Sequence, residues 1–196
     1  MTLADKVTSS RLIVAPVFFI VYLLPRFLPA VFTDARWTVP VLWILFVGSE
    51  ITDMLDGMIA RKRGELSDFG KLFDPFADTL TQLSFFFCFV LDGILPAVLF
   101  LAVLYREFSI LFVRNLMLKK GVALGARMGG KIKTVSYVLA GALALMASSV
   151  LRLSIGGGFY RWLSVAAGVV FLISVLIAVV SFFDYLSVYR NTRQQE

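Results

Sequence analysis

The chain has 196 residues, of which 59% are hydrophobic and 16% are charged, and its mean hydropathy is +0.87. This composition excludes an ordinary soluble domain and indicates a single integral membrane domain over residues 1–196. The single cysteine, Cys88, excludes an intrachain disulfide, and the absence of histidine restricts any general base to Asp, Glu, Lys, Tyr or water.

Six apolar stretches are each long enough to form a helix that crosses a bilayer. The predicted spans cover residues 9–28, 40–63, 67–91, 96–118, 133–151 and 159–187. A short interfacial helix is expected to lead into the first of them. The predicted fold is therefore an all-α integral membrane protein with six transmembrane helices and a short N-terminal interfacial helix.

Positive charge predicts the orientation of these spans. Fourteen of the nineteen Lys and Arg residues lie in the N-terminal segment, around the loops after the second and fourth spans, and in the C-terminal tail. Because cytoplasmic loops carry an excess of Lys and Arg, both termini are predicted to be cytoplasmic. The net charge of +6 is then explained by topology and contact with anionic lipid, and it does not indicate nucleic-acid binding.

Two polar residues early in the chain each allow two interpretations. Arg11 is expected either to contact a phosphate of lipid or substrate or to anchor its segment at the membrane interface. Glu50 lies three residues before Asp53, so it is expected either to support a cation site or to face a neighbouring polar group.

Four carboxylates lie where the second span ends and the third begins. Asp53 and Asp56 are three residues apart, and Asp74 and Asp78 are four residues apart, so each pair shares one helix face. Two such faces opposite one another hold four carboxylates in a small volume, where they repel each other strongly. Divalent cations such as Mg²⁺, which prefer oxygen ligands and keep positions open for phosphate, would offset that repulsion.

Small residues and an arginine accompany the carboxylates. Gly57 allows a ligand to approach the helix backbone, Ala60 is small, and Arg61 can pair with a phosphate. Gly70 lies one turn before Asp74. Together they predict a slot for a phosphorylated ligand held through metal. Structural ion pairs, or a proton or ion pathway, are the alternatives, because intramembrane carboxylates also serve transporters.

The fourth and fifth spans contribute basic residues. Arg106 and Arg114 are eight residues apart within the fourth span and can share a helix face, and Glu107 follows Arg106. Charge at that depth usually faces the bundle interior or a wet cavity. Lys131 and Lys133 open the fifth span, where a helix N-terminus favours anion binding.

The third span also carries a run of aromatic residues and a proline. Pro75 removes one backbone hydrogen bond and is expected to bend the helix. The phenylalanines are expected to pack against lipid or a partner subunit; they are Phe85, Phe86, Phe87 and Phe89.

The pattern D-x-x-D-G-x-x-A-R-x8-G-x-x-x-D-x-x-x-D resembles the signature of the CDP-alcohol phosphotransferase family. The chain has every fixed residue of it, namely Asp53, Asp56, Gly57, Ala60, Arg61, Gly70, Asp74 and Asp78. The resemblance implies six transmembrane helices, a homodimer, two divalent cations (Mg²⁺ or Mn²⁺) and a CDP-linked donor. It also implies that the nucleotide is bound by Asp56, Gly57, Ala60, Arg61 and Gly70. The Thr8, Arg11 and Pro16 spacing resembles the opening of bacterial members.

Three segments resemble the bacterial phosphatidylglycerophosphate synthase branch of that family, namely D-P-F-A-D at 74–78, R-E at 106–107 and G-K-I-K-T at 130–134. This resemblance implies an enzyme of phospholipid biosynthesis in the bacterial inner membrane, with its site facing the cytoplasm. The acceptor would be sn-glycerol 3-phosphate, a dianion suited to a basic pocket of Arg106, Arg114, Lys131 and Lys133. The chain departs from that branch at two places: Thr79 replaces the usual lysine, and the ending F-F-D-Y-L-S-V-Y-R lacks the usual glycine.

The reaction that follows is a direct phosphatidyl transfer from CDP-diacylglycerol, with CMP as the leaving group. Asp53, Asp56 and Asp74 are the predicted metal ligands, and Asp78 both approaches the metals and acts as the base. A cardiolipin synthase of the same fold, or another phosphatidyltransferase with a different acceptor, is the enzymatic alternative. A small membrane transporter is the alternative outside enzymes, and it predicts no CMP release.

Overall fold

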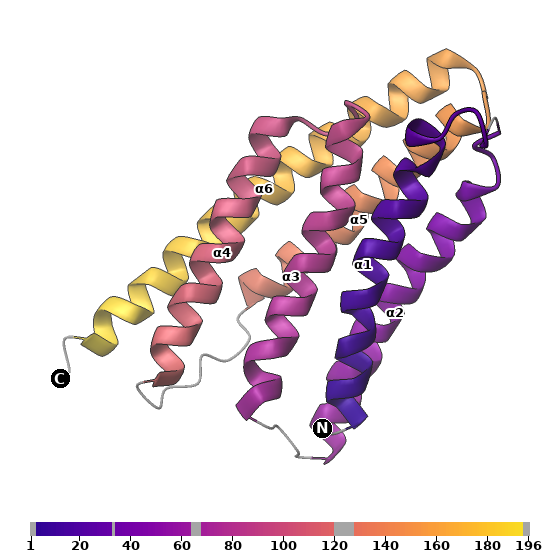
Figure 1. Cartoon of the computed structure of the whole chain (residues 1–196). Helices are drawn as coiled ribbons and strands as arrows, with labels where there is room; N and C mark the ends of the chain where they lie inside the picture. The colour runs from indigo at the N-terminus through magenta and orange to yellow at the C-terminus, as the bar shows by residue number, and fades with distance from the viewer. Residues whose placement is uncertain (1–2, 33, 64–67, 120–127, 194–196) are drawn as a thin grey trace.

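The computed structural model describes the backbone of residues 3–32, 34–63, 68–119 and 128–193, and the side chains of residues 11–32, 34–53, 73–118, 130 and 132–187. Within these ranges the chain forms a helical bundle without strands (Figure 1). The helices are α1 (Leu3–Phe27), α2 (Thr38–Arg63), α3 (Asp68–Leu91), α4 (Ala97–Lys119), α5 (Met128–Arg152) and α6 (Gly157–Arg193). The predicted all-α class is confirmed, and each predicted span corresponds to one helix.

The N-terminal segment differs from the expectation of a separate interfacial helix. Leu3–Phe27 is one continuous α-helix that includes Pro16 and Pro25. A proline removes one intrahelical hydrogen bond but leaves those of the neighbouring turns, so the helix continues through it. Pro75 likewise lies inside the continuous helix α3. The expected interfacial helix is thus the first part of α1.

Two helical segments of the described chain are long and apolar enough to cross a membrane by length and composition. They are Ile132–Arg152 in α5 and Gly157–Ser187 in α6. In α4, by contrast, Arg106, Glu107 and Arg114 interrupt the apolar sequence. The apolar helices agree with a membrane protein, since a bilayer-spanning segment needs about 20 predominantly apolar residues.

The helices pack in a connected bundle in which α1 lies against both α2 and α3, and α5 lies along α6. The helix α4 packs on α3 and α6. In Figure 1, the beginning of α1 and the end of α6 lie at the same end of the bundle, as expected for an even number of helices that alternate in direction. The turns that join α1 to α2, α3 to α4 and α5 to α6 lie at the other end.

The phenylalanine run of α3 forms core rather than an outer surface, which corrects the expectation of lipid or partner contact for most of it. Phe85, Phe86 and Phe89 are fully buried, whereas Phe87 is 40% exposed. At 100° per residue, the first three lie within one face of α3 and Phe87 lies on the opposite side. The ring of Phe85 lies 4.4 Å from that of Phe18 on α1, centroid to centroid.

Close approach of α2 and α5 depends on a small residue. A Cβ added at Gly141 of α5 would lie 3.0 Å from Cε2 and 3.1 Å from Cζ of Phe46 on α2. Phe46 is buried, and its ring also contacts Phe85 with centroids 5.4 Å apart. Gly141 therefore lets the aromatic core of α2 and α3 reach the backbone of α5.

The end of the bundle near the α1–α2 and α3–α4 turns is held by Arg152. Its guanidinium donates to the Tyr22 carbonyl at 3.0 Å, to the Thr38 hydroxyl at 2.9 Å and to the Ser148 hydroxyl at 3.1 Å, and it lies over the Tyr22 ring. The Tyr22 hydroxyl donates to Asp92, just after α3, at 2.7 Å. This network joins α1, α2, α3 and α5.

Candidate functional site

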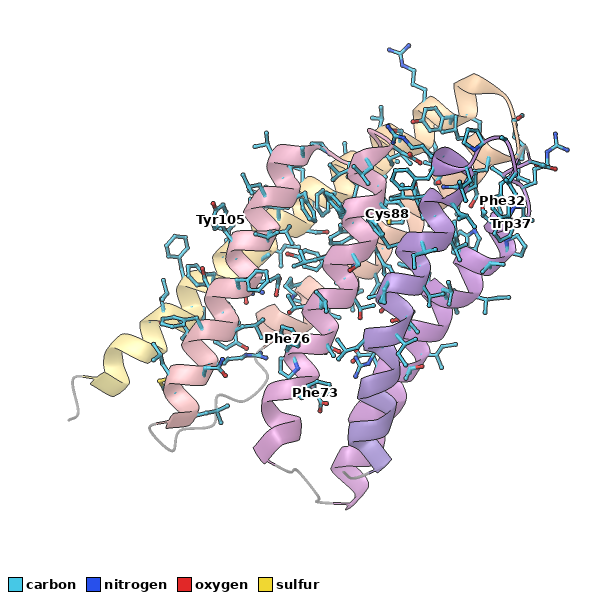
Figure 2. The ribbon with its side chains drawn as sticks, in the orientation of Figure 1. Phe32, Trp37, Phe73, Phe76, Cys88 and Tyr105 are labelled. Atoms are coloured by element: carbon cyan, nitrogen blue, oxygen red, sulfur yellow. The ribbon has the colours of Figure 1, made fainter. Side chains whose placement is uncertain are left out.

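A cavity of about 310 Å³ opens between the helices and is lined by residues from all six of them. The carboxylates of Asp53, Asp74 and Asp78 line one part of it, and Arg106, Glu107, Arg114 and Lys133 line another. Figure 2 shows Phe73 and Phe76, which flank Asp74, on the half of α3 that lies toward the ends of the chain. The cavity thus brings together two groups of residues that the sequence pattern singled out separately.

At the acidic part, carboxylates from two helices meet at one arginine. Nη1 of Arg11 on α1 donates to Oδ1 of Asp53 on α2 at 2.6 Å and to Oδ1 of Asp78 on α3. Because both oxygens accept from the same nitrogen, the two carboxyl groups lie next to each other. Their side chains remain 43% and 44% exposed, so the cavity keeps access to them. The structure thus brings one motif carboxylate of α2 and one of α3 together at Arg11, and the metal-binding role of the motif stays a prediction.

The burial of Arg11 contradicts the expected interfacial anchor, whereas its expected contact with a phosphate stays a prediction. Its side chain is 3% exposed and pairs with motif aspartates. The Thr81 hydroxyl on α3 donates to the Arg11 backbone carbonyl at 3.3 Å, which ties this turn of α1 to α3. Its sequence signal is weak, because one arginine near the start of an apolar segment is equally typical of an interfacial anchor.

The donor set at this part of the cavity fits a hard divalent cation. Asp53, Asp74 and Asp78 present carboxylate oxygens from two helices, which are the ligands that Mg²⁺ and Mn²⁺ prefer. Among the side chains that the structure describes, no three acidic, histidine or cysteine groups are gathered closely enough to form a complete metal site. The Asp56 side chain, the fourth predicted ligand, lies outside the described side chains.

The remaining motif residues are described by their backbone alone. Asp56, Gly57, Ala60 and Arg61 lie in the last turns of α2. Gly70 lies in the first turn of α3, one turn before Asp74. Their side chains fall outside the described ones, so their nucleotide-binding role stays a prediction.

At the basic part, a buried acid joins two cations. Glu107 Oε1 accepts from Arg106 Nη1 at 2.8 Å, and both Glu107 oxygens accept from Lys133 Nζ at 3.0 and 3.1 Å. The Glu107 side chain is 8% exposed and that of Arg106 is 6% exposed. The pair faces the bundle interior, whereas the preceding residue, Tyr105, lies on the outer side of α4 and is 66% exposed (Figure 2).

Arg106 is also held by the last helix. Its Nε donates to the Ala178 carbonyl at 3.1 Å, and its Nη2 lies 3.5 Å from the Ser181 hydroxyl, both on α6. All three guanidinium nitrogens of Arg106 therefore have protein partners. The Nζ of Lys133 lies 4.8 Å from the centre of the Tyr137 ring. Arg106 thus serves as a tie between α4 and α6 as well as a charge beside the cavity.

Arg114 is the least engaged of these cations. Its Nη2 donates to the Tyr185 hydroxyl at 3.3 Å, and its guanidinium lies 5.6 Å from the centre of that ring. Within the described part of the chain, Arg114 Nε is buried without a hydrogen-bond partner, as is Nε2 of Gln82, which also lines the cavity. Lys131 follows Gly130 in α5, and its side chain is outside the described ones.

Tyr185 of α6 lies at the cavity, although no sequence pattern predicted a role for it. Tyr185 is buried, lines the cavity and contacts Arg114, and its hydroxyl lies 3.8 Å from a Cβ added at Gly130. A tyrosine in a long apolar helix carries no spacing signal, so only the packing of α6 against α4 and α5 reveals its position. Glu50 and Thr79 line the same cavity, and both roles expected for Glu50 stay predictions.

Comparison with known proteins agrees with the motif. Residues 1–180 match the family described as CDP-alcohol phosphatidyltransferase. A Treponema pallidum protein named CDP-diacylglycerol–glycerol-3-phosphate 3-phosphatidyltransferase is 36% identical, over 96% of this chain and 89% of the relative. Proteins of the same name from Bacillus subtilis and Rickettsia typhi are 32% and 27% identical, over 70% and 93% of this chain and 73% and 94% of the relatives. The motif aspartates lie within the matched residues, and the chain belongs to the CDP-alcohol phosphatidyltransferase family.

Proposed function

We propose that this chain is a phosphatidyltransferase of phospholipid biosynthesis. It transfers the phosphatidyl group of CDP-diacylglycerol to sn-glycerol 3-phosphate and gives phosphatidylglycerophosphate and CMP. The observation that carries the proposal is a cavity lined both by three motif carboxylates and by the basic cluster of α4 and α5. The relatives at 27–36% identity are named for this donor and acceptor, which supports the same substrates here.

The donor is assigned to the acidic part of the cavity. Asp53, Asp56, Asp74 and Asp78 would hold two divalent cations there, and these cations would neutralise the pyrophosphate and stabilise charge on the attacking and leaving oxygens. Gly57, Ala60 and Gly70 are assigned to the nucleotide, because small residues in the last turns of α2 and the first turn of α3 leave room for it, and Arg61 is assigned to its phosphate. The acyl chains would remain in the bilayer.

The acceptor is assigned to the basic part. Among the described side chains, Arg106, Arg114 and Lys133 carry three positive charges and Glu107 carries one negative charge, so this part has a net excess of positive charge beside the cavity. A small dianion such as glycerol 3-phosphate matches that excess better than a neutral polyol does. The buried Nε of Arg114 and Nε2 of Gln82 are donors that a polar ligand can satisfy. Lys131 is assigned to the same anion.

Asp78 is assigned as the general base. Its carboxylate belongs to the acidic part, lines the cavity that also contains the basic part, and remains 44% exposed. The acceptor hydroxyl oxygen attacks the phosphorus that carries diacylglycerol, the bond from that phosphorus to the CMP oxygen breaks, and the hydroxyl proton passes to Asp78. Histidine is absent from the chain, so a carboxylate is the natural acceptor of this proton.

We assign the whole chain to one membrane domain with six spans, both termini and the cavity mouth on the cytoplasmic side, and a homodimer in the bacterial inner membrane. The distribution of Lys and Arg supports the orientation. The shared end of α1 and α6 in Figure 1 supports an even number of crossings. The dimer is supported by the family resemblance and by the exposed apolar side chains on the helices, which suit lipid or a second copy.

The experiment is CMP release by purified protein in detergent with CDP-diacylglycerol and Mg²⁺. Glycerol 3-phosphate, phosphatidylglycerol, glycerol and serine are compared as acceptors. We expect release that depends on glycerol 3-phosphate. Release that depends on phosphatidylglycerol would indicate a cardiolipin synthase instead, and no release with any acceptor would contradict the enzymatic proposal.

A further inference from the structure

Arg11 is the buried cation at the acidic part of the cavity, and its contacts set it apart from the other arginines. It donates from one nitrogen to Asp53 and Asp78, while its own side chain is 3% exposed. Its backbone carbonyl accepts from the Thr81 hydroxyl, one turn beyond Asp78 on α3. One residue of α1 thus fixes the point at which α2 and α3 bring their motif carboxylates together.

The positive charge of Arg11 has two opposite electrostatic effects on this site. The guanidinium offsets the repulsion between two neighbouring carboxylates, which stabilises them in place. A divalent cation bound to the same carboxylates is attracted by them but repelled by the guanidinium, since charges of equal sign at near-contact distance interact strongly. Solvent that reaches the half-exposed carboxylates screens part of this repulsion without removing it.

We propose that Arg11 is an internal counter-ion of the catalytic centre. It positions Asp53 and Asp78 and limits how tightly they hold a divalent cation. The inference rests on the cation site of the proposed function. Its consequence is specific: removing the positive charge of Arg11 increases the affinity of the site for a divalent cation, even though it removes two hydrogen bonds.

Arg152 provides the matched control for a purely structural arginine. It also joins several helices, but it donates to a backbone carbonyl and to hydroxyls at the far end of the bundle. Loss of Arg152 therefore lowers stability without changing the charge around Asp53 and Asp78. A shift in cation affinity separates the two arginines, whereas a shift in melting temperature alone does not.

The experiment measures Mn²⁺ binding to purified protein in detergent by electron paramagnetic resonance, with melting temperatures recorded beside it. The variants are R11Q, R11K and R152Q. We expect R11Q to bind Mn²⁺ about tenfold more tightly, the order of magnitude for one nearby unit charge after solvent screening. R11K keeps the charge and should stay close to the wild-type affinity, and R152Q should melt lower with unchanged affinity.

Mn²⁺ affinity in R11Q that equals or falls below that of the wild type would overturn the proposal, as would an equal increase in R11K. Should R11Q fail to fold, the comparison is made between D53N and the double variant R11Q/D53N, whose net charge equals that of the wild type. Tighter Mn²⁺ binding in the double variant supports the counter-ion, and equal or weaker binding overturns it. Absence of Mn²⁺ binding in the wild type would instead refute the proposed cation site, and this inference with it.

Discussion

Replacement of Glu107 is the perturbation whose stability effect follows most directly from the structure. Its carboxylate is 8% exposed and accepts from Arg106 at 2.8 Å and from Lys133 at 3.0 and 3.1 Å. Breaking a buried ion pair by removing one partner costs about 3–5 kcal/mol, because the other charge stays buried and uncompensated. Here E107A leaves two cations in that state, so we expect a loss at the upper end of this range.

E107Q separates charge from hydrogen bonding at the same position. Its amide oxygen can still accept from Lys133, so we expect a smaller loss, of about 1–3 kcal/mol, the usual penalty for a buried polar group that is left imperfectly paired. The melting temperature should be highest for the wild type, lower for E107Q and lowest for E107A.

The assay is thermal unfolding of purified protein in detergent, with D34N as the control. Asp34 and Arg36 form a pair at 3.8 Å whose side chains are 66% and 61% exposed, and such a surface pair contributes little. D34N should have the same melting temperature as the wild type. If E107A had the same melting temperature as D34N, the Arg106–Glu107–Lys133 cluster would not stabilise the contact between α4 and α5.

Three further predictions concern the reaction and the core. D78N should keep its fold and its nucleotide binding, while kcat falls by a factor of about 10²–10⁴, the usual contribution of a general base. D53N should instead lose affinity for both the metal and the nucleotide. Equal loss of metal affinity in both variants would make Asp78 chiefly a ligand. R114A should raise KM for glycerol 3-phosphate about tenfold or more, with little change in KM for CDP-diacylglycerol, because a charge-assisted contact is worth about 1.5–3 kcal/mol; equal effects on both KM values would contradict its acceptor role. G141L should lower the melting temperature through its clash with Phe46, by an amount that corresponds to about 1–3 kcal/mol, while G168L, which meets open space, should not.

Local periodicity predicted the parts of the fold and site that lie within one or two neighbouring helices. The spacing within the pairs Asp53/Asp56 and Asp74/Asp78 predicted that each pair shares one helix face. The structure brings Asp53, Asp74 and Asp78 to one cavity. Apolar length likewise predicted the six helices. These features need only the 3.6-residue period and the distribution of polar groups.

The sequence could not predict features that depend on which helices pack together. Phe85, Phe86 and Phe89 are as apolar as lipid-facing residues, so hydropathy cannot tell the core face of a membrane helix from its outer face. Arg11 and Tyr185 reach the cavity from the first and last helices, and their partners lie 67 and 71 residues away in the chain. No local pattern encodes such pairings.

Formation of phosphatidylglycerophosphate tests the central claim most directly. Purified protein is given CDP-diacylglycerol, Mg²⁺ and radiolabelled sn-glycerol 3-phosphate, and label is counted in the organic phase beside CMP in the aqueous phase. We expect one labelled lipid for each CMP released, and loss of both products with EDTA or in D78N. Lipid that stays unlabelled, or labelling that persists in full after EDTA treatment, would contradict the central claim.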